Sequence, residues 1–209
     1  MAFIQTVPVS DSTDDVRAMY AQSQKALGYV PNYAKLFSHR PAVMDAWGSL
    51  LRSIRSTLDT RRYELATMAA AHALRSSYCL LAHGTILSRD FYGPDQTTQI
   101  AHDFTRADLS PTDVAIMSFA ERIARDATSV GAADIQQLRD YGLTDAEIFD
   151  VAAAAAVRCF FSKLLDALGA EPDSAFLSLD DHLRSELTVG RSISQMPVEV
   201  VSDESPSTG

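Results

Sequence analysis

The stretch that decides the fold is ELATMAAAHALRSSYCLLAH, from Glu64 to His83. Its first half is rich in alanine, which favours a helix that a second helix approaches closely. Arg75, Ser76 and Ser77 then break the apolar pattern and predict a boundary between two helices. Ser76 is placed to be the N-cap of the second helix, because serine side chains accept hydrogen bonds from the first free backbone N–H groups. The stretch therefore predicts two consecutive helices joined at Ser76.

Helix signals continue along the rest of the chain, with serine, threonine or proline at the expected starts and glycine after several ends. The expected helices begin near Ser12, Pro31, Pro41, Thr60, Ser76, Pro94, Ser110, Thr144 and Ser174. The first ends at Gly28, the long apolar helix from Ile148 to Leu168 ends at Gly169, and the last ends near Leu187. Alternating β-branched runs are missing outside the first and last few residues, so the sequence predicts an all-α fold.

Length and composition bound the organisation of the chain. The 209 residues suffice for one domain with a buried core. We expect this domain to span residues 1–190, with a functional core at about 42–127. From 191 to 209 the composition turns to Ser, Pro, Glu and Val with no periodic apolar face, which is typical of an extended or disordered tail.

Charge and hydropathy exclude several kinds of partner. The net charge is −9 and the acidic residues are scattered, whereas nucleic-acid binding needs clustered Lys and Arg. No run of ~18 apolar residues could cross a membrane, and the N-terminus lacks the basic and apolar regions of a signal peptide. The two cysteines, Cys79 and Cys159, do not form a disulfide framework. We expect a cytoplasmic protein with free thiols and neither nucleic-acid nor membrane partners.

Cys79 is the candidate nucleophile. If Ser76 is the N-cap, Cys79 lies in the first turn of its helix, where free N–H groups and the helix dipole favour a thiolate. His83 follows four residues later on the same helix face and can exchange a proton with the thiol, directly or through a water. Glu64 belongs to the preceding helix, so its distance depends on how the helices pack. The competing interpretation is a buried cysteine that packs as a small apolar side chain.

Several neighbouring side chains have two interpretations each. Tyr78 either donates its hydroxyl group to the site or packs at its mouth. Arg61, Arg62 and Arg75 form either a solvated face or a ring that attracts an anionic substrate. Cys159 lies in the most apolar helix, where we expect it to serve core packing.

A metal site is a further interpretation of the side chains near Cys79. Glu64, His72, Cys79 and His83 are acceptable zinc ligands. No compact ligand pair of the usual kind joins them in the sequence. We therefore expect neither a metal nor a cofactor.

The residues around Cys79 resemble a known signature. They are Glu64, Ser76, Tyr78, Cys79, Ala82 and His83. Their spacing is similar to that of the carboxymuconolactone decarboxylase family in its alkylhydroperoxidase D-like (AhpD-like) branch. That signature is Glu, then C-x-x-C beginning twelve residues later, then His four residues after the second cysteine. The resemblance covers most of residues 42–127, and Tyr29–Asn32 and Leu36–Pro41 also resemble the peroxidase-related branch.

The resemblance implies an AhpD-like bundle of about seven to nine helices that assembles into dimers, trimers or hexamers and reduces hydroperoxides. Cys79 would be the peroxidatic nucleophile, and His83 and Glu64 the proton relay. Ser76 stands where dithiol members carry the cysteine that resolves the sulfenic acid as a disulfide, which a serine cannot do. Either an external thiol reduces Cys79, or Cys159 resolves it, or the site has left redox chemistry.

Three functions follow from these alternatives. The first is hydroperoxide reduction through Cys79, with an external thiol as the reductant. The second is a decarboxylase-like lyase or isomerase in which His83 or Glu64 acts as general base and Cys79 is incidental. The third is a helical binding protein without catalysis.

Overall fold

The computed structural model describes residues 2–201, which form ten α-helices. Their bounds are α1 (Asp14–Leu27), α2 (Asn32–Phe37), α3 (Pro41–Arg55), α4 (Thr60–Ala73), α5 (Ser77–Leu87), α6 (Gly93–Asp103), α7 (Pro111–Asp126), α8 (Ala132–Asp140), α9 (Asp145–Leu168) and α10 (Asp181–Leu187). Short helical segments join them: η1 (Val9–Asp11), η2 (Ser88–Tyr92), η3 (Ala127–Ser129) and η4 (Ser174–Ser178). Within the described part, the one β-type pairing is an isolated bridge between Val30 and Glu199. The predicted all-α fold is confirmed.

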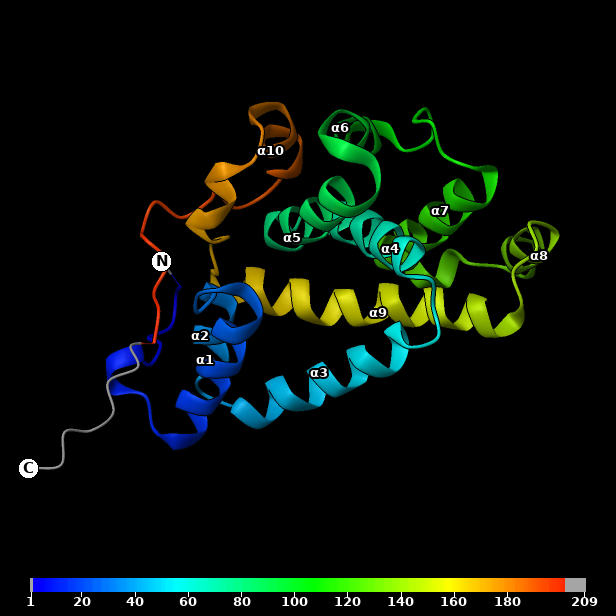
Figure 1. Cartoon of the computed structure of the whole chain (residues 1–209). Helices are drawn as coiled ribbons and strands as arrows, with labels where there is room; N and C mark the ends of the chain where they lie inside the picture. Colours follow the sequence, from blue (N-terminus) through cyan, green and yellow to red (C-terminus); the bar gives the residue numbers. More distant parts are fainter. Residues whose placement is uncertain (1, 202–209) are drawn as a thin grey trace, which may run out of the picture.

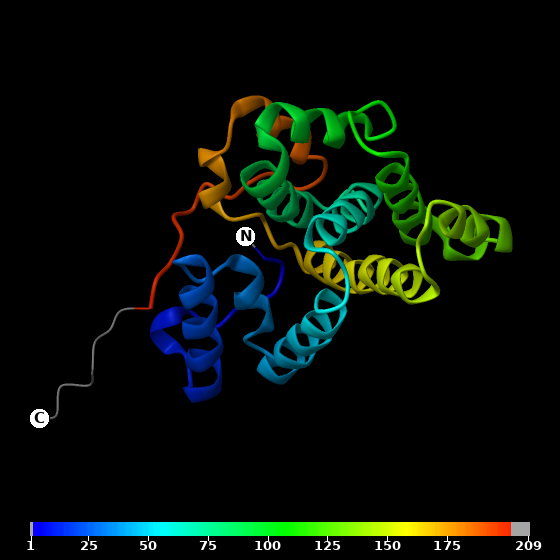
Figure 2. The same ribbon diagram turned by 45° about the vertical axis from the view of Figure 1, so that its right-hand side comes forward.

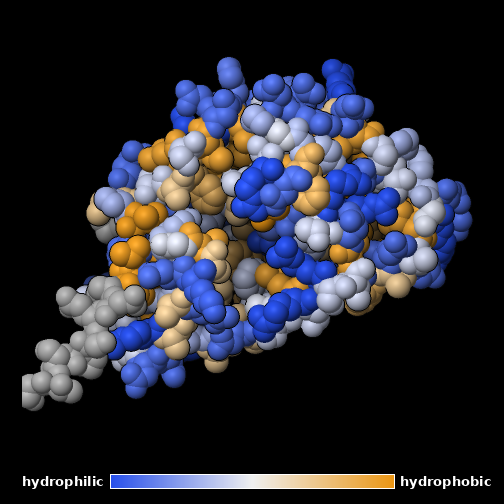
Figure 3. Space-filling view, in the orientation of Figure 1, coloured by the Kyte–Doolittle hydropathy of each residue, from blue (hydrophilic) through white to orange (hydrophobic). Residues whose placement is uncertain are grey.

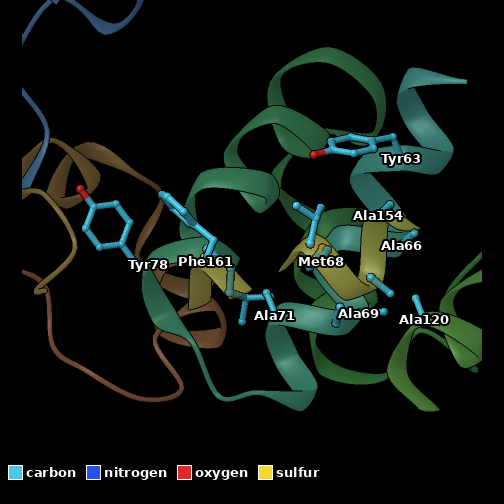
Figure 4. Close-up of a cluster of buried hydrophobic side chains, with 14 of the residues drawn as sticks. Tyr63, Ala66, Met68, Ala69, Ala71, Tyr78, Ala120, Ala154 and Phe161 are labelled. Atoms are coloured by element: carbon cyan, nitrogen blue, oxygen red, sulfur yellow. The ribbon is translucent and has the colours of Figure 1, made fainter. Parts of the chain in front are cut away.

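The helices pack around α9 and α4. Figures 1 and 2 show α9 running through the middle of the molecule, with α4, α5 and α7 on one side and α3 on the other. Figure 4 shows Ala66, Ala69 and Ala71 of α4 in one cluster with Ala120 of α7 and Ala154 of α9. These small side chains let the three helices approach closely, so α4 is enclosed along most of its length.

The predicted boundary between α4 and α5 is a tight turn. Arg75 adopts a left-handed backbone conformation with φ of 56°. Its N–H donates to the carbonyl of His72 at 2.9 Å, and the N–H of Ser76 donates to the carbonyl of Ala71 at 3.0 Å. These two bonds satisfy two of the carbonyls in the last turn of α4, and α5 begins at Ser77.

Several predicted helix signals occupy their expected positions. Gly28 and Gly169 end α1 and α9 in the left-handed region, with φ of 86° and 79°. Pro41 is the first residue of α3. The side chains of Ser110 and Thr144 cap α7 and α9 by accepting backbone N–H bonds. Local capping residues therefore mark these helix ends in the sequence.

Two predicted caps are wrong by one residue. Thr13, not Ser12, precedes α1. Asp59, not Thr60, caps α4, because its carboxylate accepts the backbone N–H of Arg62 at 3.0 Å. In the second case the sequence offered two adjacent capping side chains, and the carboxylate also complements the positive end of the helix dipole.

The predicted last helix is also wrong, because residues 174–187 form two segments. The first is η4 and the second is α10. The carboxylate of Asp180 interrupts the helical path by accepting the backbone N–H groups of His182 and Leu183. Asp180 thereby acts as the N-cap of a new helix.

Part of the predicted tail packs against the helices. Residues 191–201 are extended, and the backbone N–H of Val30 donates to the carbonyl of Glu199 at 2.8 Å. Ser194 is buried in this segment. The remainder of the predicted tail, residues 202–209, lies outside the described residues.

The surface in Figure 3 is mainly hydrophilic along its upper edge, and hydrophobic side chains gather near the chain termini on the left. Phe3 and Met196 of these terminal segments are 69% and 68% exposed. Among the helices of residues 2–201, none combines the length and the apolar character needed to cross a membrane.

Candidate active site

Cys79 lies on helix α5, in the interior of the bundle. Both ends of the predicted site are enclosed, because Cys79 is 1% exposed and His83 is 8% exposed. Gly84 allows α10 to approach, since a Cβ atom there would lie 2.6 Å from a methyl group of Leu187. The sulfur of Cys79 is therefore surrounded by neighbouring helices instead of by solvent.

The sulfur of Cys79 accepts two hydrogen bonds from α9. The hydroxyl of Ser162 donates to Sγ at 3.1 Å, and Nη1 of Arg158 donates to it at 3.4 Å. These two residues are four apart on α9, so they share one face of that helix. Both are buried. The environment of the thiol thus contains a cation and a hydroxyl donor, where an apolar pocket would be expected for a cysteine that only packs.

Glu64 and His83 form a buried pair that the sequence alone did not establish. Nδ1 of His83 is hydrogen-bonded to Oε2 of Glu64, which is completely buried on α4. An ionised carboxylate only accepts hydrogen bonds, so a neutral His83 carries its proton on Nδ1. Nε2 is then left with a free lone pair. This is the arrangement in which a carboxylate orients an imidazole as a general base.

The charges of this pair are set by burial and by two arginines. Burial raises the pKa of Glu64, but His83, Arg55 and Arg158 together outweigh it, and the pKa is lowered. Burial lowers the pKa of His83, Arg158 lowers it further, and Glu64 offsets only part of this effect. The resting pair is therefore a carboxylate and a neutral imidazole at pH 7.

Arg55 and Tyr63 complete the surroundings of the pair. Nη2 of Arg55 lies 3.5 Å from Oε1 of Glu64, and its side chain is 48% exposed. The guanidinium of Arg55 stacks over the ring of Tyr63, 5.0 Å from its centroid, and that ring meets His83 edge-on. Arg55 thus connects the buried carboxylate to the surface at the end of α3.

Ser76 occupies the predicted N-cap position but does not cap. Its side chain makes no hydrogen bond to the first turn of α5, and it is completely buried. Its hydroxyl has no partner within hydrogen-bond distance among the described residues, although its proximity to Asp166 on α9 opposes the rise that burial causes in the pKa of that carboxyl. The predicted capping role of Ser76 is therefore wrong.

Tyr78 points away from the thiol. Figure 4 places Tyr78 and Tyr63 at opposite ends of the buried cluster. The hydroxyl of Tyr78 donates to Asp173 at 2.5 Å and accepts the backbone N–H of Tyr33 at 3.2 Å. Of its two predicted roles, the structure favours packing, since the hydroxyl ties α5 to α2 and to the segment before η4.

The three arginines suggested as an anion-binding ring are dispersed. Arg61 donates two hydrogen bonds to Asp113, and Nε of Arg62 lies 3.5 Å from the same carboxylate. Arg75 donates to the carbonyl of Val189. None of these contacts involves Cys79, so the ring interpretation is wrong.

His72 and Cys159 stand apart from the pair. His72 lines a separate cavity of about 180 Å³ with residues of α6 and α7. Cys159 is half-buried with a free thiol, and burial raises its pKa. Within residues 2–201, no three His, Cys, Asp or Glu side chains converge as they would around a metal ion.

Sequence reasoning missed Arg158, Ser162 and Arg55. The first two had a usable signal, because Arg158 is the one charged residue in the run VAAAAAVRCFF and a buried arginine needs a partner. Ser162 follows it at helical spacing. Arg55 ends an amphipathic helix like many surface arginines, so nothing local distinguished it.

No model of a known protein family matches the chain, and no curated protein does. Solved structures match over most of its length. The alkylhydroperoxidase AhpD core of a peroxidase-related protein from Ralstonia eutropha JMP134 is 26% identical with a TM-score of 0.76, covering 84% of this chain and 94% of that one. A peroxidase-related protein from Silicibacter sp. TM1040 is 20% identical with a TM-score of 0.76, covering 85% and 94%.

A third solved structure has the same architecture. The debrominase Bmp8 in complex with 2,3,4-tribromopyrrole is 17% identical with a TM-score of 0.69, covering 88% of this chain and 95% of that one. The three matched proteins share the order and packing of the helices with this chain. The chain therefore has the AhpD-like fold of the peroxidase-related proteins.

Proposed function

We propose that the protein reduces small hydroperoxides through Cys79, with an external thiol as the reductant. The observation that carries this proposal is the Glu64–His83 hydrogen bond, which orients an imidazole one helical turn from the thiol. The AhpD-like fold of peroxidase-related proteins supports it. The contacts of the sulfur with Arg158 and Ser162 support it as well, because they favour the nucleophilic form.

The first half-reaction oxidises the sulfur by two electrons. The Cys79 thiolate attacks the terminal oxygen of the hydroperoxide, so an S–O bond forms and the O–O bond breaks. The leaving oxygen departs as an alcohol or water after taking one proton from His83. His83 receives that proton at Nε2, from the thiol or from solvent at its exposed edge. Glu64 stabilises the imidazolium that exists after His83 takes up the proton and before it gives the proton to the leaving oxygen.

The second half-reaction returns the sulfur to its starting state. A thiol of the reductant attacks the sulfenic acid, releasing water and forming a mixed disulfide. A second thiol of the reductant then displaces Cys79. Ser76 cannot replace that external thiol, because its hydroxyl does not form a disulfide.

Burial restricts the substrate to small molecules. Cys79 is nearly inaccessible, and His83 exposes only a small part of its side chain. We expect hydrogen peroxide and short alkyl hydroperoxides to react faster than bulky ones, since bulky ones require the surrounding helices to move.

Peroxide consumption in the presence of dithiothreitol tests the proposal. Cys79→Ser should abolish consumption, and Cys159→Ser should leave it unchanged. His83→Ala should slow it by roughly 10²–10⁴-fold, the usual contribution of general acid–base catalysis. Full consumption by Cys79→Ser would overturn the proposal.

The same variants decide the alternative of a decarboxylase-like lyase or isomerase. In that case turnover of a lactone substrate would survive Cys79→Ser and be lost in His83→Ala. The hydrogen bonds that converge on the sulfur of Cys79 favour the redox proposal, because a lyase that relies on His83 and Glu64 has no need of them.

A further inference from the structure

We infer that Arg158 is a second catalytic residue, which holds Cys79 as a thiolate in the resting protein and contacts the oxygen of the bound peroxide. The second half of this inference rests on the proposed function, and the first half does not. Arg158 touches the reacting atom directly, because its Nη1 lies 3.4 Å from the sulfur. Arg158 lies outside the signature around Cys79.

The first argument is the charge of Arg158. The residue is 3% exposed, and a buried guanidinium is strongly unfavourable without a negative partner. No carboxylate of residues 2–201 forms a direct ion pair with it; Glu64 acts on it electrostatically but is hydrogen-bonded to His83 and lies beside Arg55. Cys79 and the ring of Phe161 contact Arg158, and Tyr63 interacts with it electrostatically. Of these, Cys79 is the one that readily becomes an anion near neutral pH.

The guanidinium itself stays charged. Burial lowers the pKa of Arg158, but its interactions with Cys79 and with Tyr63 outweigh burial and raise it. A neutral Arg158 is thus excluded as the way to relieve the burial of its charge. The Glu64 carboxylate acts on the guanidinium without direct ion-pair contact, so a thiolate at Cys79 would be the anion that touches it.

The second argument is the direction of the hydrogen bonds at the sulfur. Arg158 can only donate, and the hydroxyl of Ser162, 3.1 Å from the sulfur, can donate as well. Both bonds are stronger to a thiolate than to a neutral thiol, because bonds to a charged acceptor are stronger. Ser162 accordingly acts as a positioning residue that fixes the thiolate beside the guanidinium.

The third argument concerns the substrate. Nε of Arg158 is buried and has no hydrogen-bond partner among the described residues. Nε and Nη1 belong to the same rigid, planar guanidinium, and Nη1 contacts the sulfur. The donor without a partner therefore lies close to the sulfur. A peroxide oxygen that approaches the sulfur is an acceptor for this donor. Arg158 would then stabilise the charge that develops on the leaving oxygen.

Arg158 also acts electrostatically on His83 of α5 and on Tyr63 and Glu64 of α4, and Arg55 of α3 acts on the same Glu64 and His83. Arg158 keeps its protons throughout the step. The thiolate forms the S–O bond, the O–O bond breaks, and the leaving oxygen takes a proton that His83 relays from solvent. With that proton the thiolate and the hydroperoxide yield a sulfenic acid and an alcohol or water.

Thiolate absorbance in the ultraviolet, recorded against pH in the folded Cys159→Ser protein, tests the resting state. This background leaves Cys79 as the single cysteine. We expect the absorbance of the thiolate to persist well below pH ~8.5, the ordinary midpoint of a cysteine. A midpoint at or above that value in the otherwise unmodified protein would overturn the inference, whatever the variants do.

Variants assign the effect to the guanidinium. Arg158→Met should raise the midpoint by about one to three pH units, the effect of one opposite charge at contact distance. Arg158→Lys should restore part of the shift, and the matched control Ser162→Ala should move the midpoint less than Arg158→Met. An unchanged midpoint in Arg158→Met, with circular dichroism showing a folded protein, would overturn the inference.

The two proposals fail in different ways. A low midpoint that depends on Arg158 in a protein that consumes no peroxide would refute the proposed function and leave the ion pair. Peroxide consumption through Cys79 at equal rates in Arg158→Met and Arg158→Lys, measured above both midpoints, would refute the contact with the peroxide oxygen. A loss of at least about tenfold in Arg158→Met alone under those conditions would support it.

Discussion

Replacing Glu64 should reveal how strongly the buried pair depends on its carboxylate. Glu64 is completely buried, is hydrogen-bonded to Nδ1 of His83, and lies 3.5 Å from the guanidinium of Arg55. Glu64→Ala removes all of these interactions and leaves the N–H of His83 without a partner. Glu64→Gln keeps the shape of the side chain and a carbonyl oxygen that can accept that N–H.

The two variants differ in the size of the expected loss. Glu64→Ala leaves the buried N–H of the neutral His83 unsatisfied, which costs about 1–3 kcal/mol, and it also leaves a cavity. The half-exposed Arg55 recovers some hydration, so we expect a total loss of about 3 kcal/mol. Glu64→Gln loses the charge but keeps a neutral hydrogen bond, which should limit its cost to roughly 1–3 kcal/mol.

The pH dependence follows from the direction of the shift. The pKa of Glu64 is lowered in the folded state, so the stabilisation by its charge is fully present above the unfolded value of about 4.3 and is lost as the pH falls through the folded value. The pKa of His83 is lowered too, so acidification below about 6.5 protonates the unfolded chain first and destabilises both proteins. The advantage of the natural protein over Glu64→Gln should therefore shrink as the pH falls below about 4.3.

Urea denaturation followed by circular dichroism measures these free energies of unfolding. The comparison at pH 7 and at pH 4 separates the charge of Glu64 from its shape. A loss below about 1 kcal/mol in Glu64→Ala would refute the buried pair, because a loss of that size is typical of an exposed ion pair. An advantage over Glu64→Gln that grows as the pH falls below about 4.3 would refute the direction of the Glu64 shift.

Three further changes have defined outcomes. Ser76→Cys places a thiol at the resolving position of the signature, so one equivalent of peroxide should consume two thiols per chain by forming a disulfide. The natural protein should instead yield a trappable sulfenic acid. Mass spectrometry distinguishes the two products. Tyr78→Phe should lower stability by about 1–3 kcal/mol, because Asp173 loses a donor, while peroxide consumption is retained. Gly84→Ala should lower the free energy of unfolding by about 1–3 kcal/mol, because the new methyl group overlaps Leu187. The control Gly48→Ala, whose Cβ atom would lie 3.4 Å from Arg52, should be neutral or stabilising. Thermal unfolding measures both effects.

Helix ends could be predicted from the sequence because capping is local. Ser110, Thr144 and Gly169 act through backbone groups within a few residues, and all three occupy the expected positions. The errors arose where two capping side chains are adjacent, as at Asp59 and Thr60, or where a carboxylate caps within an apolar pattern. Neither case is resolved by spacing alone, because several starts satisfy the same pattern.

The sequence predicts the contacts of the site that lie within one helix, but not those between helices. The shared face of Cys79 and His83 follows from their separation, but the contact of Glu64 with His83 depends on how α4 packs against α5. The contact of Cys79 with Arg158 joins residues 79 positions apart. Such pairings are made by tertiary packing, and a single sequence contains only the indirect signal of an arginine inside an apolar helix.

The labelling of Cys79 after peroxide treatment tests the central claim most directly. The Cys159→Ser protein would be treated with one equivalent of hydrogen peroxide in the presence of dimedone and analysed by peptide mass spectrometry. The redox function predicts that the dimedone adduct forms on Cys79, and that His83→Ala in the same background forms it more slowly. A Cys79 that stays a free, unlabelled thiol while the peroxide persists would contradict the claim.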